Sequence, residues 1–281
     1  MSRAHRRTVL GFALAAPLLA TGGRVWAFPD VDEDSPWLAH GEESDLAPDH
    51  TPLARFLARY RTVGADGIAR VRYGAVTGQH RADLRAYLDV LAAVPVSRLP
   101  RAVQQAFWIN LYNGLTLDLV LAHYPVASIR DIGGGLFTVG PWGETVVVVE
   151  GRELSLDDIE HGILRPIWRD PRLHYALNCA SLGCPDLAAT PWSATTGEAM
   201  LEEAAWGYVN HPRGARFDAR GQLVVSSIYR WYGEDFGGGE AGVLNHLRRH
   251  AGEPLAEGLA RIDAIADDSY DWRLNDGSGL P

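Results

Sequence analysis

The sequence predicts a single-domain α+β protein in which a buried central helix packs on a mostly antiparallel sheet. Residues 101–123 lie between two prolines and are apolar at nearly every position after 105, which is typical of a helix inside a core. Short β-branched and aromatic runs follow in 136–154 and 216–227, separated by glycine-containing turns. No repeat or linker interrupts the chain after residue 50, so one domain over 51–281 is the simplest organisation.

The first 27 residues are predicted to form a secretory signal peptide. A basic start without acids precedes an apolar run over 9–20, and residues 25–27 supply a small-residue cleavage pattern. The run is shorter than the roughly 20 apolar residues that span a bilayer, so no membrane span is predicted. The pair Arg6-Arg7 favours the twin-arginine route, which exports folded proteins. We therefore expect a periplasmic protein.

The predicted domain is preceded by a leader and opens with two helices. Residues 28–50 are acidic, contain prolines and lack a periodic pattern, so we expect a disordered acidic leader. Apolar residues recur at helical spacing in 51–63 and again in 81–96, and each segment predicts an amphipathic helix. The central helix follows at 101–123.

Two amides interrupt the apolar surface of the central helix. Asn110 and Asn113 are three residues apart and therefore share one face. A buried amide costs several kcal/mol unless its hydrogen-bond partners are supplied. These side chains are expected either to fix neighbouring loops or to line a cleft.

The chain beyond the central helix alternates short strands, turns and helices. Two runs within 136–154 predict a hairpin through a Gly-Pro turn. Ser155 and Asp158 have the spacing of a capping box, which predicts a short helix that ends at Pro166. Residues 172–179 predict a buried strand, with His174 and Cys179 on opposite faces. The later predicted elements are a helix at 196–209, a hairpin at 216–227, and helices at 226–238 and 243–250.

Composition excludes several classes of function. The chain has 26 basic and 35 acidic side chains, and the predicted signal peptide contains four arginines and no acid, so the mature charge is −13. Such a surface repels phosphate backbones, which argues against nucleic-acid binding. Every basic residue is arginine, and a chain without lysine has no Schiff-base anchor for pyridoxal phosphate and no P-loop. We predict no cofactor.

The chain contains two cysteines, Cys179 and Cys184, in the segment HYALNCASLGCPDL. In an oxidising compartment a pair of cysteines usually forms a disulfide, and the turn containing Gly183 could bring the two together. A reactive thiol is the second interpretation, because a histidine that could lower its pKa and a polar group that could orient this histidine are within reach in the sequence. A metal site is the weakest, since no histidine pair has the local spacing of a zinc site, and we predict no metal.

Nine tryptophans are a further notable feature of the composition. Most are expected to pack in the core or at its rim, because aromatic side chains bury a large area. Their number also suits a stacking groove for a peptide or carbohydrate. The tryptophans considered are Trp108, Trp142, Trp168, Trp231 and Trp272.

Four blocks of the sequence together resemble a known family. FWINLYNGLTLDLVLAHYPVASIRDI, GRELSLDDIEHGILR, DPRLHYALNCASLGCPDL and SSIYRWYGEDFGG are similar, in this order, to the domain of unknown function 547 (DUF-547), over about 51–250. The resemblance implies a domain of exported or membrane-tethered bacterial proteins, also found in plants, whose biochemical role is unsettled. It also implies a fold similar to the papain and transglutaminase group of thiol enzymes.

The papain-like comparison can be carried onto some positions of this sequence. His174, which follows the central helix, fits the place of the papain-type histidine, with Asn178 or a residue on a neighbouring strand as its orienting group. The central helix contains no cysteine, so the expected place of the nucleophile is empty. Either Cys179 or Cys184 would have to reach the site from its loop, or the domain has kept the scaffold without the chemistry.

The sequence therefore predicts an exported, thiol-dependent hydrolase or acyl transferase that acts on peptides or thiol-containing small molecules. Cys179 is the predicted nucleophile, with His174 or His161 as the base and Glu160 or Asn178 as the orienting group. Asn110 or Asn113 is the predicted donor to an oxyanion, and the predicted substrate-binding residues are Asn110, Asn113, Asn178 and Cys184. The alternative is a non-catalytic module that binds a peptide or a partner and contains a Cys179–Cys184 disulfide.

Overall fold

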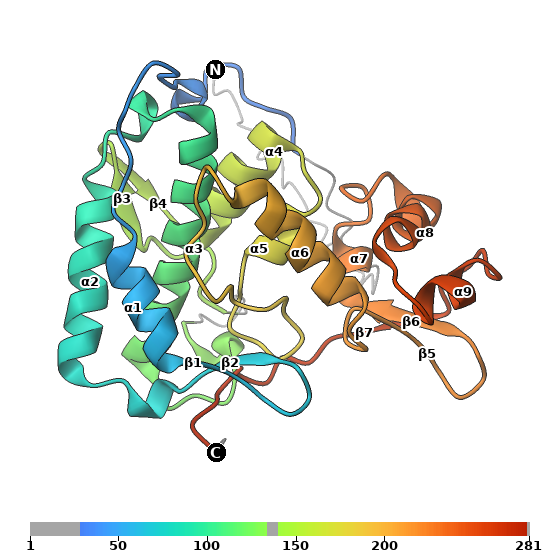
Figure 1. Cartoon of the computed structure of the whole chain (residues 1–281). Coiled ribbons are helices and arrows are strands. Elements are labelled where there is room, and N and C mark those ends of the chain that lie inside the picture. The colour runs from blue at the N-terminus through green and yellow to red at the C-terminus, as the bar shows by residue number, and fades with distance from the viewer. Residues whose placement is uncertain (1–28, 134–139, 280–281) are drawn as a thin grey trace, which may run out of the picture.

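The computed structural model describes residues 29–133 and 140–279 (Figure 1). The predicted signal peptide and the first run of the predicted hairpin, 136–139, lie outside the described residues. The α-helices are α1 (Thr51–Tyr60), α2 (Gly78–Ala92), α3 (Arg101–His123), α4 (Arg165–Trp168), α5 (Leu173–Ala176), α6 (Gly197–Val209), α7 (Ser227–Trp231), α8 (Gly239–His250) and α9 (Leu255–Leu259). The strands are β1 (Arg61–Val63), β2 (Ala69–Val71), β3 (Val147–Val149), β4 (Arg152–Leu154), β5 (Ala215–Phe217), β6 (Leu223–Ser226) and β7 (Asp267–Ser269). Short 3₁₀ turns are η1 (Pro36–Leu38), η2 (Tyr73–Ala75), η3 (Val96–Arg98) and η4 (Ile129–Asp131), and η5 (Asp158–Leu164) is a π-helix.

Helix α3 is the centre of the molecule, as the sequence predicted. It begins after Pro100, ends before Pro125, and is buried at every position from Ala106 to Asp118. It packs mainly against α2 and η5, and Figure 1 shows it enclosed by other helices. The prediction that the central helix packs on a sheet was therefore wrong, because its apolar surface is covered by helices.

The strands form three small sheets rather than one antiparallel sheet. Strands β1 and β2 form one antiparallel pair, and β3 and β4 form another. In the third sheet β5 is antiparallel to β6, whereas β7 is parallel to it. A mixed α+β class is confirmed, but each sheet is too small to form a layer under the central helix.

The hairpin within 136–154 turns at a different place from the predicted one. Val147 pairs with Leu154, and the chain reverses at Glu150 and Gly151, which have φ of 47° and 77°. Two successive residues with positive φ suit the tight hairpin turn that matches strand twist. The valine-rich run therefore supplies one strand before this turn, and the predicted Gly-Pro turn precedes the hairpin.

The capping box at Ser155 and Asp158 is confirmed. The Asp158 amide donates to Ser155 Oγ at 3.1 Å, and the Ser155 amide donates to Asp158 Oδ2 at 2.8 Å. The helical segment does not end at Pro166, as predicted, but continues to Trp168 and stops at Arg169, where φ is 49°. Pro166 lies in the first turn of α4, where a missing amide donor is tolerated.

The predicted strand at 172–179 was also wrong in its first half. Asp170 and Pro171 start a turn: the Arg172 amide donates to Asp170 Oδ1 at 2.8 Å, and the His174 amide donates to the Pro171 carbonyl at 3.3 Å. An Asp-Pro pair favours turn initiation, and here it leads directly into α5. Only the residues after Ala176 are extended.

The acidic leader contacts the domain, which differs from the predicted disorder. Trp37 is 7% exposed and its ring meets that of Trp108 edge-on, with centroids 5.1 Å apart. The Gln104 amide donates to the Ala39 carbonyl at 2.7 Å, and Arg101 donates to the Leu38 carbonyl at 2.6 Å. One buried indole and three anchored carbonyls hold this segment although its composition is polar; the third carbonyl is that of Trp37.

In the described part of the chain, two hydrophobic clusters form the interior. The larger one surrounds α1, α2 and α3. The smaller one includes residues of α6, α7, α8, α9, β5 and β6, and Figure 1 places α7, α8 and α9 on the other side of α6 from α1 and α2. Ala204 of α6 contacts both clusters. None of the helices in the described part of the chain is long and apolar enough to span a bilayer.

Candidate active site

A cavity of about 710 Å³ brings most of the predicted site residues together. It lies among η5, the segment after α5, α7 and residues 270–272. Its described lining includes five of the predicted residues: Glu160, His161, His174, Cys179 and Cys184. The predicted amides of Asn110, Asn113 and Asn178 are not among its described lining residues.

Asn113 fixes the cysteine segment to the central helix instead of facing the cavity. Its Nδ2 donates to the Ala176 carbonyl at 2.9 Å, and its Oδ1 accepts from the Asn178 amide at 2.8 Å. One buried side chain thus satisfies a donor and an acceptor on either side of Leu177. The predicted role as an oxyanion donor does not fit this arrangement, because both ends of the amide are already hydrogen-bonded.

Asn110 and Asn178 also bind backbone groups. Asn110 exchanges two hydrogen bonds with the backbone of Trp192, at 2.8 and 2.9 Å. Asn178 donates to the Pro185 carbonyl at 2.8 Å and accepts from the Ala180 amide at 3.0 Å. These bonds close the loop that carries both cysteines, so Asn178 orients this loop and not a histidine.

The loop turns tightly between the two cysteines. Ala180 has a φ of 59°, in the left-handed region. Gly183 lies against the backbone of Asp271, whose amide nitrogen would be 2.7 Å from an added Cβ, so a larger residue would push these segments apart. Its own amide donates to the Asp271 carbonyl at 2.8 Å. The loop is therefore held against residues 270–273 near the carboxyl end of the chain.

The two cysteines are free thiols whose sulfur atoms lie 3.0 Å apart. The Cys179 sulfur is also 3.2 Å from Ser181 Oγ and 3.1 Å from the Tyr270 hydroxyl. Cys184 is buried, and its sulfur accepts a hydrogen bond from the Cys179 amide at 3.0 Å. Three groups able to donate a hydrogen bond thus surround the Cys179 sulfur.

These contacts and burial shift the pKa values of the two thiols in opposite directions. The hydrogen bond between the two thiols lowers the pKa of Cys179 to about 7, and its contacts with Ser181 and Tyr270 help to offset the effect of burial. Burial raises the pKa of Cys184 well above its usual value, and the neighbouring Cys179 raises it further. Burial likewise raises the pKa of Tyr270 far above its usual range, so its hydroxyl keeps the proton that it donates. Cys179 is therefore the thiolate of the pair.

His174 lines the same cavity and is held by a buried carboxylate that the sequence did not point to. Its Nε2 is 2.7 Å from Asp235 Oδ2, and its ring stacks on Tyr232 with centroids 4.2 Å apart. Arg165 binds Asp235 through two hydrogen bonds of 2.7 and 2.9 Å. Burial alone would raise the pKa of Asp235, but the bonds from His174 and Arg165 outweigh it and lower the pKa. Asp235 therefore stays ionised and fixes the imidazole ring.

Glu160 stands between the two predicted histidines. Its Oε1 is 3.7 Å from His174 Nδ1 and 3.9 Å from His161 Nδ1, while the Tyr112 hydroxyl donates to Oε2 at 3.2 Å. Glu160 therefore faces the histidine nitrogen that Asp235 leaves available. His161 also lies 3.7 Å from Asp157 and contacts Arg165, which places it at the edge of this network.

The structure does not join Cys179 to a histidine directly. Within the described part of the chain, the hydrogen-bond partners of its sulfur are Cys184, Ser181 and Tyr270. The sequence predicted His174 or His161 as the base that activates this thiol, whereas in the described structure hydrogen bonds with Cys184, Ser181 and Tyr270 lower its pKa. His174 lines the same cavity, and its Nε2 is held by Asp235.

The described residues contain no ready metal site. Among residues 29–133 and 140–279, no group of three or more His, Cys, Asp or Glu side chains is arranged to hold a metal ion.

Comparison with known proteins supports the family resemblance. Residues 96–209 match the model of a family described as protein of unknown function, DUF547. This segment contains α3, Glu160, His174 and both cysteines, and it ends before Asp235 and Tyr270. No curated protein matches the chain, and neither does any solved structure. The papain-like fold therefore stays a prediction.

Replacing Asn113 by alanine should lower the free energy of unfolding by about 2–4 kcal/mol, because two buried backbone groups would lose their partners. Urea denaturation measures this change. Asn245→Ala serves as a control, since Asn245 is exposed on α8, and it should change stability by less than about 0.5 kcal/mol. Equal effects of the two substitutions would contradict the role of Asn113.

The rate at which iodoacetamide alkylates Cys179 should rise with pH and reach half of its maximum near pH 7, because the thiolate is the reacting form. Tyr270→Phe removes one donor to the sulfur, so its half-maximum should move to higher pH. Tyr229→Phe is a suitable control, since this buried hydroxyl bonds Tyr175 and not the sulfur. A profile centred at the pKa of an ordinary thiol, about 8.5, would show that the three contacts do not stabilise the thiolate.

Proposed function

We propose that this chain, which matches DUF547 over residues 96–209, is a thiol-dependent hydrolase or acyl transferase with Cys179 as its nucleophile. One observation carries the proposal: an acidic thiol and a carboxylate-bound histidine line the same cavity. Nucleophilic catalysis needs a nucleophile that is ionised near neutral pH and a positioned acid–base group. Both are present, on separate walls.

The reaction would proceed through a thioester. The Cys179 thiolate attacks the carbonyl carbon of the substrate, and the bond to the leaving group breaks as that group takes a proton from His174 Nδ1. Water then loses a proton to the same nitrogen and attacks the thioester, which releases the acid and restores the thiolate. In acyl transfer an amine, alcohol or thiol replaces the water. Asp235 keeps the ring oriented through Nε2 at both stages.

The cavity walls support peptides or small thioesters as substrates. Trp272 stacks on Trp231 with centroids 5.6 Å apart, and Trp142 meets it edge-on at 5.7 Å. Together with Tyr232 they form an aromatic wall of the cavity. Such a wall would hold an apolar side chain or acyl chain, with the polar carbonyl directed to Cys179.

We further propose that the domain has a papain-like arrangement and that it acts in the periplasm. The order of a central helix followed by a histidine supports the first point, although the nucleophile comes from a loop after this helix. The basic and apolar residues of 1–27 support export. The Arg6-Arg7 pair supports the twin-arginine route.

Thiol–disulfide exchange is the second candidate, and the separation of 3.0 Å between the two sulfur atoms favours it. Cys179 would attack a substrate disulfide and release one thiol. Cys184 would then attack the mixed disulfide, release the second thiol and leave a Cys179–Cys184 disulfide, so two electrons pass from the pair to the substrate. This oxidised form is also the one that the predicted binding module would contain.

The two candidates differ in their need for Cys184 and His174. We expect a panel of acyl thioesters and activated peptide esters to leave an acyl group on Cys179, detected by intact mass after rapid quenching. Cys179→Ser should abolish the adduct, Cys184→Ser should retain it, and His174→Gln should slow its hydrolysis by about 10²–10⁴-fold. His123→Gln, an exposed change outside the cavity, should have no effect.

A different pattern would favour disulfide exchange. If no substrate acylates Cys179, and if the protein reduces glutathione disulfide in a way that Cys184→Ser abolishes, the acyl-transfer proposal is wrong. Loss of neither reaction in Cys179→Ser would exclude both candidates.

A further inference from the structure

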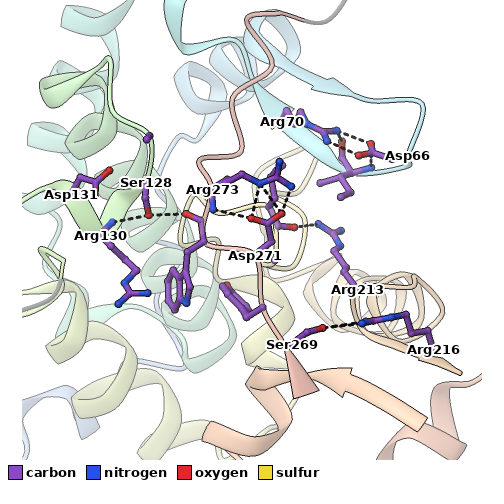
Figure 2. A pocket seen from close by; sticks show the side chains of 16 residues that line it. Asp66, Arg70, Ser128, Arg130, Asp131, Arg213, Arg216, Ser269, Asp271 and Arg273 are labelled. Atoms are coloured by element: carbon purple, nitrogen blue, oxygen red, sulfur yellow. Dashed lines mark hydrogen bonds and ion pairs between the residues drawn. The ribbon is translucent and has the colours of Figure 1, made fainter. Parts of the chain in front are cut away.

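A second groove, of about 1,100 Å³, lies beside the candidate active site and is rich in charge (Figure 2). Five arginines and three aspartates are among the residues that line it: Arg70, Arg130, Arg213, Arg216, Arg273, Asp66, Asp131 and Asp271. The chain as a whole has a net charge of −9. Arginine therefore exceeds aspartate in this groove, although the chain as a whole is acidic.

Three of the five arginines are neutralised by neighbouring carboxylates. Arg70 forms an ion pair with Asp66 at 2.5 Å. Arg213 pairs with Asp186 at 2.6 Å and also donates to two backbone carbonyls of the cysteine loop. Arg273 pairs with Asp271. These contacts shape the floor of the groove and leave little positive charge for a ligand.

Arg130 and Arg216 are different. The Arg130 guanidinium lies 5.1 Å above the ring of Trp272, and that of Arg216 donates to Ser269 Oγ at 3.2 Å. Among the residues that the structure describes, neither guanidinium forms an ion pair with a carboxylate. Figure 2 shows them on opposite sides of the groove, with Asp271 and Arg273 between them.

The groove adjoins the cavity that contains Cys179. Tyr270 and Trp272 line both. The Tyr270 hydroxyl bonds the Cys179 sulfur, and the Trp272 ring lies under Arg130. A chain molecule lying in the groove could therefore continue into the cavity past these two rings.

We propose that this groove binds a peptide with acidic side chains, which place one carboxylate on Arg130 and another on Arg216. A guanidinium matches a carboxylate through two parallel hydrogen bonds. Two separated cations suit single charges spaced along a peptide, whereas the aspartates within the groove oppose the concentrated charge of a polyphosphate. The proposal concerns binding and does not depend on catalysis at Cys179.

The test is calorimetric titration of the full protein with a hexaglutamate peptide at low salt. The double substitution Arg130→Gln/Arg216→Gln should weaken binding at least tenfold. Arg152→Gln/Arg261→Gln changes the net charge equally at exposed positions outside the groove and should weaken it less than twofold. Arg130→Lys/Arg216→Lys, which keeps both charges, should lose less than Arg130→Gln/Arg216→Gln and shows that the groove still folds.

Three outcomes would overturn the proposal. One is the absence of binding to the unchanged protein, and another is an equal loss in the two double glutamine variants, which would indicate a general charge effect. The third is tighter binding of tripolyphosphate than of hexaglutamate, with dependence on Arg130 and Arg216, because the ligand would then be a phosphate compound. Hexaglutamine, which has the same length without charge, should not bind.

Discussion

The double hydrogen bond from Asn113 to the backbone on either side of Leu177 is the constraint on which the site depends. It ties the end of α5 and the segment after it to the central helix α3, and so fixes the position of the cysteine loop relative to the core. Asn178 then closes that loop onto Pro185. Without these amides the two sulfur atoms would belong to an exposed turn, and the contacts that acidify Cys179 would be lost.

The chemistry of the cavity follows from a division between its walls. The cysteine loop and Tyr270 stabilise the thiolate of Cys179. The imidazole of His174 is hydrogen-bonded to Asp235 through Nε2, and its Nδ1 faces Glu160. Because the Cys179 sulfur bonds neither histidine in the described structure, a substrate would complete the arrangement by lying between the walls. This separation also explains how the same thiol could serve acyl transfer or disulfide exchange, since its activation does not use His174.

The sequence predicted the features that arise from local pattern, and missed those that arise from contacts between distant segments. The sequence alone predicted the bounds of α3 and the capping box at Ser155, because apolar runs and cap spacing are local patterns. It also predicted that Glu160, His174 and Cys179 lie around one cavity, because cysteine is rare in this chain. Asp235 was not, since it is one of 35 acidic residues and lies in a glycine-rich stretch. Its only signal was the family-like block SSIYRWYGEDFGG. The turn at Asp170-Pro171 was visible as a dipeptide, but the apolar residues after it favoured a strand. Asn110 and Asn113 were correctly expected to be either clamps or cleft residues, and only their partners could decide between these roles.

The central claim is that Cys179 is a free, reactive thiol in the native protein. It is tested most directly by the intact mass of protein that is purified without reductant and then treated with iodoacetamide under native conditions, with and without a reduction step beforehand. We expect one label without reduction, located on Cys179, and a second label on Cys184 only after denaturation. Labels that appear only after reduction would show that the two cysteines are bridged, and would contradict the proposal of a thiolate nucleophile.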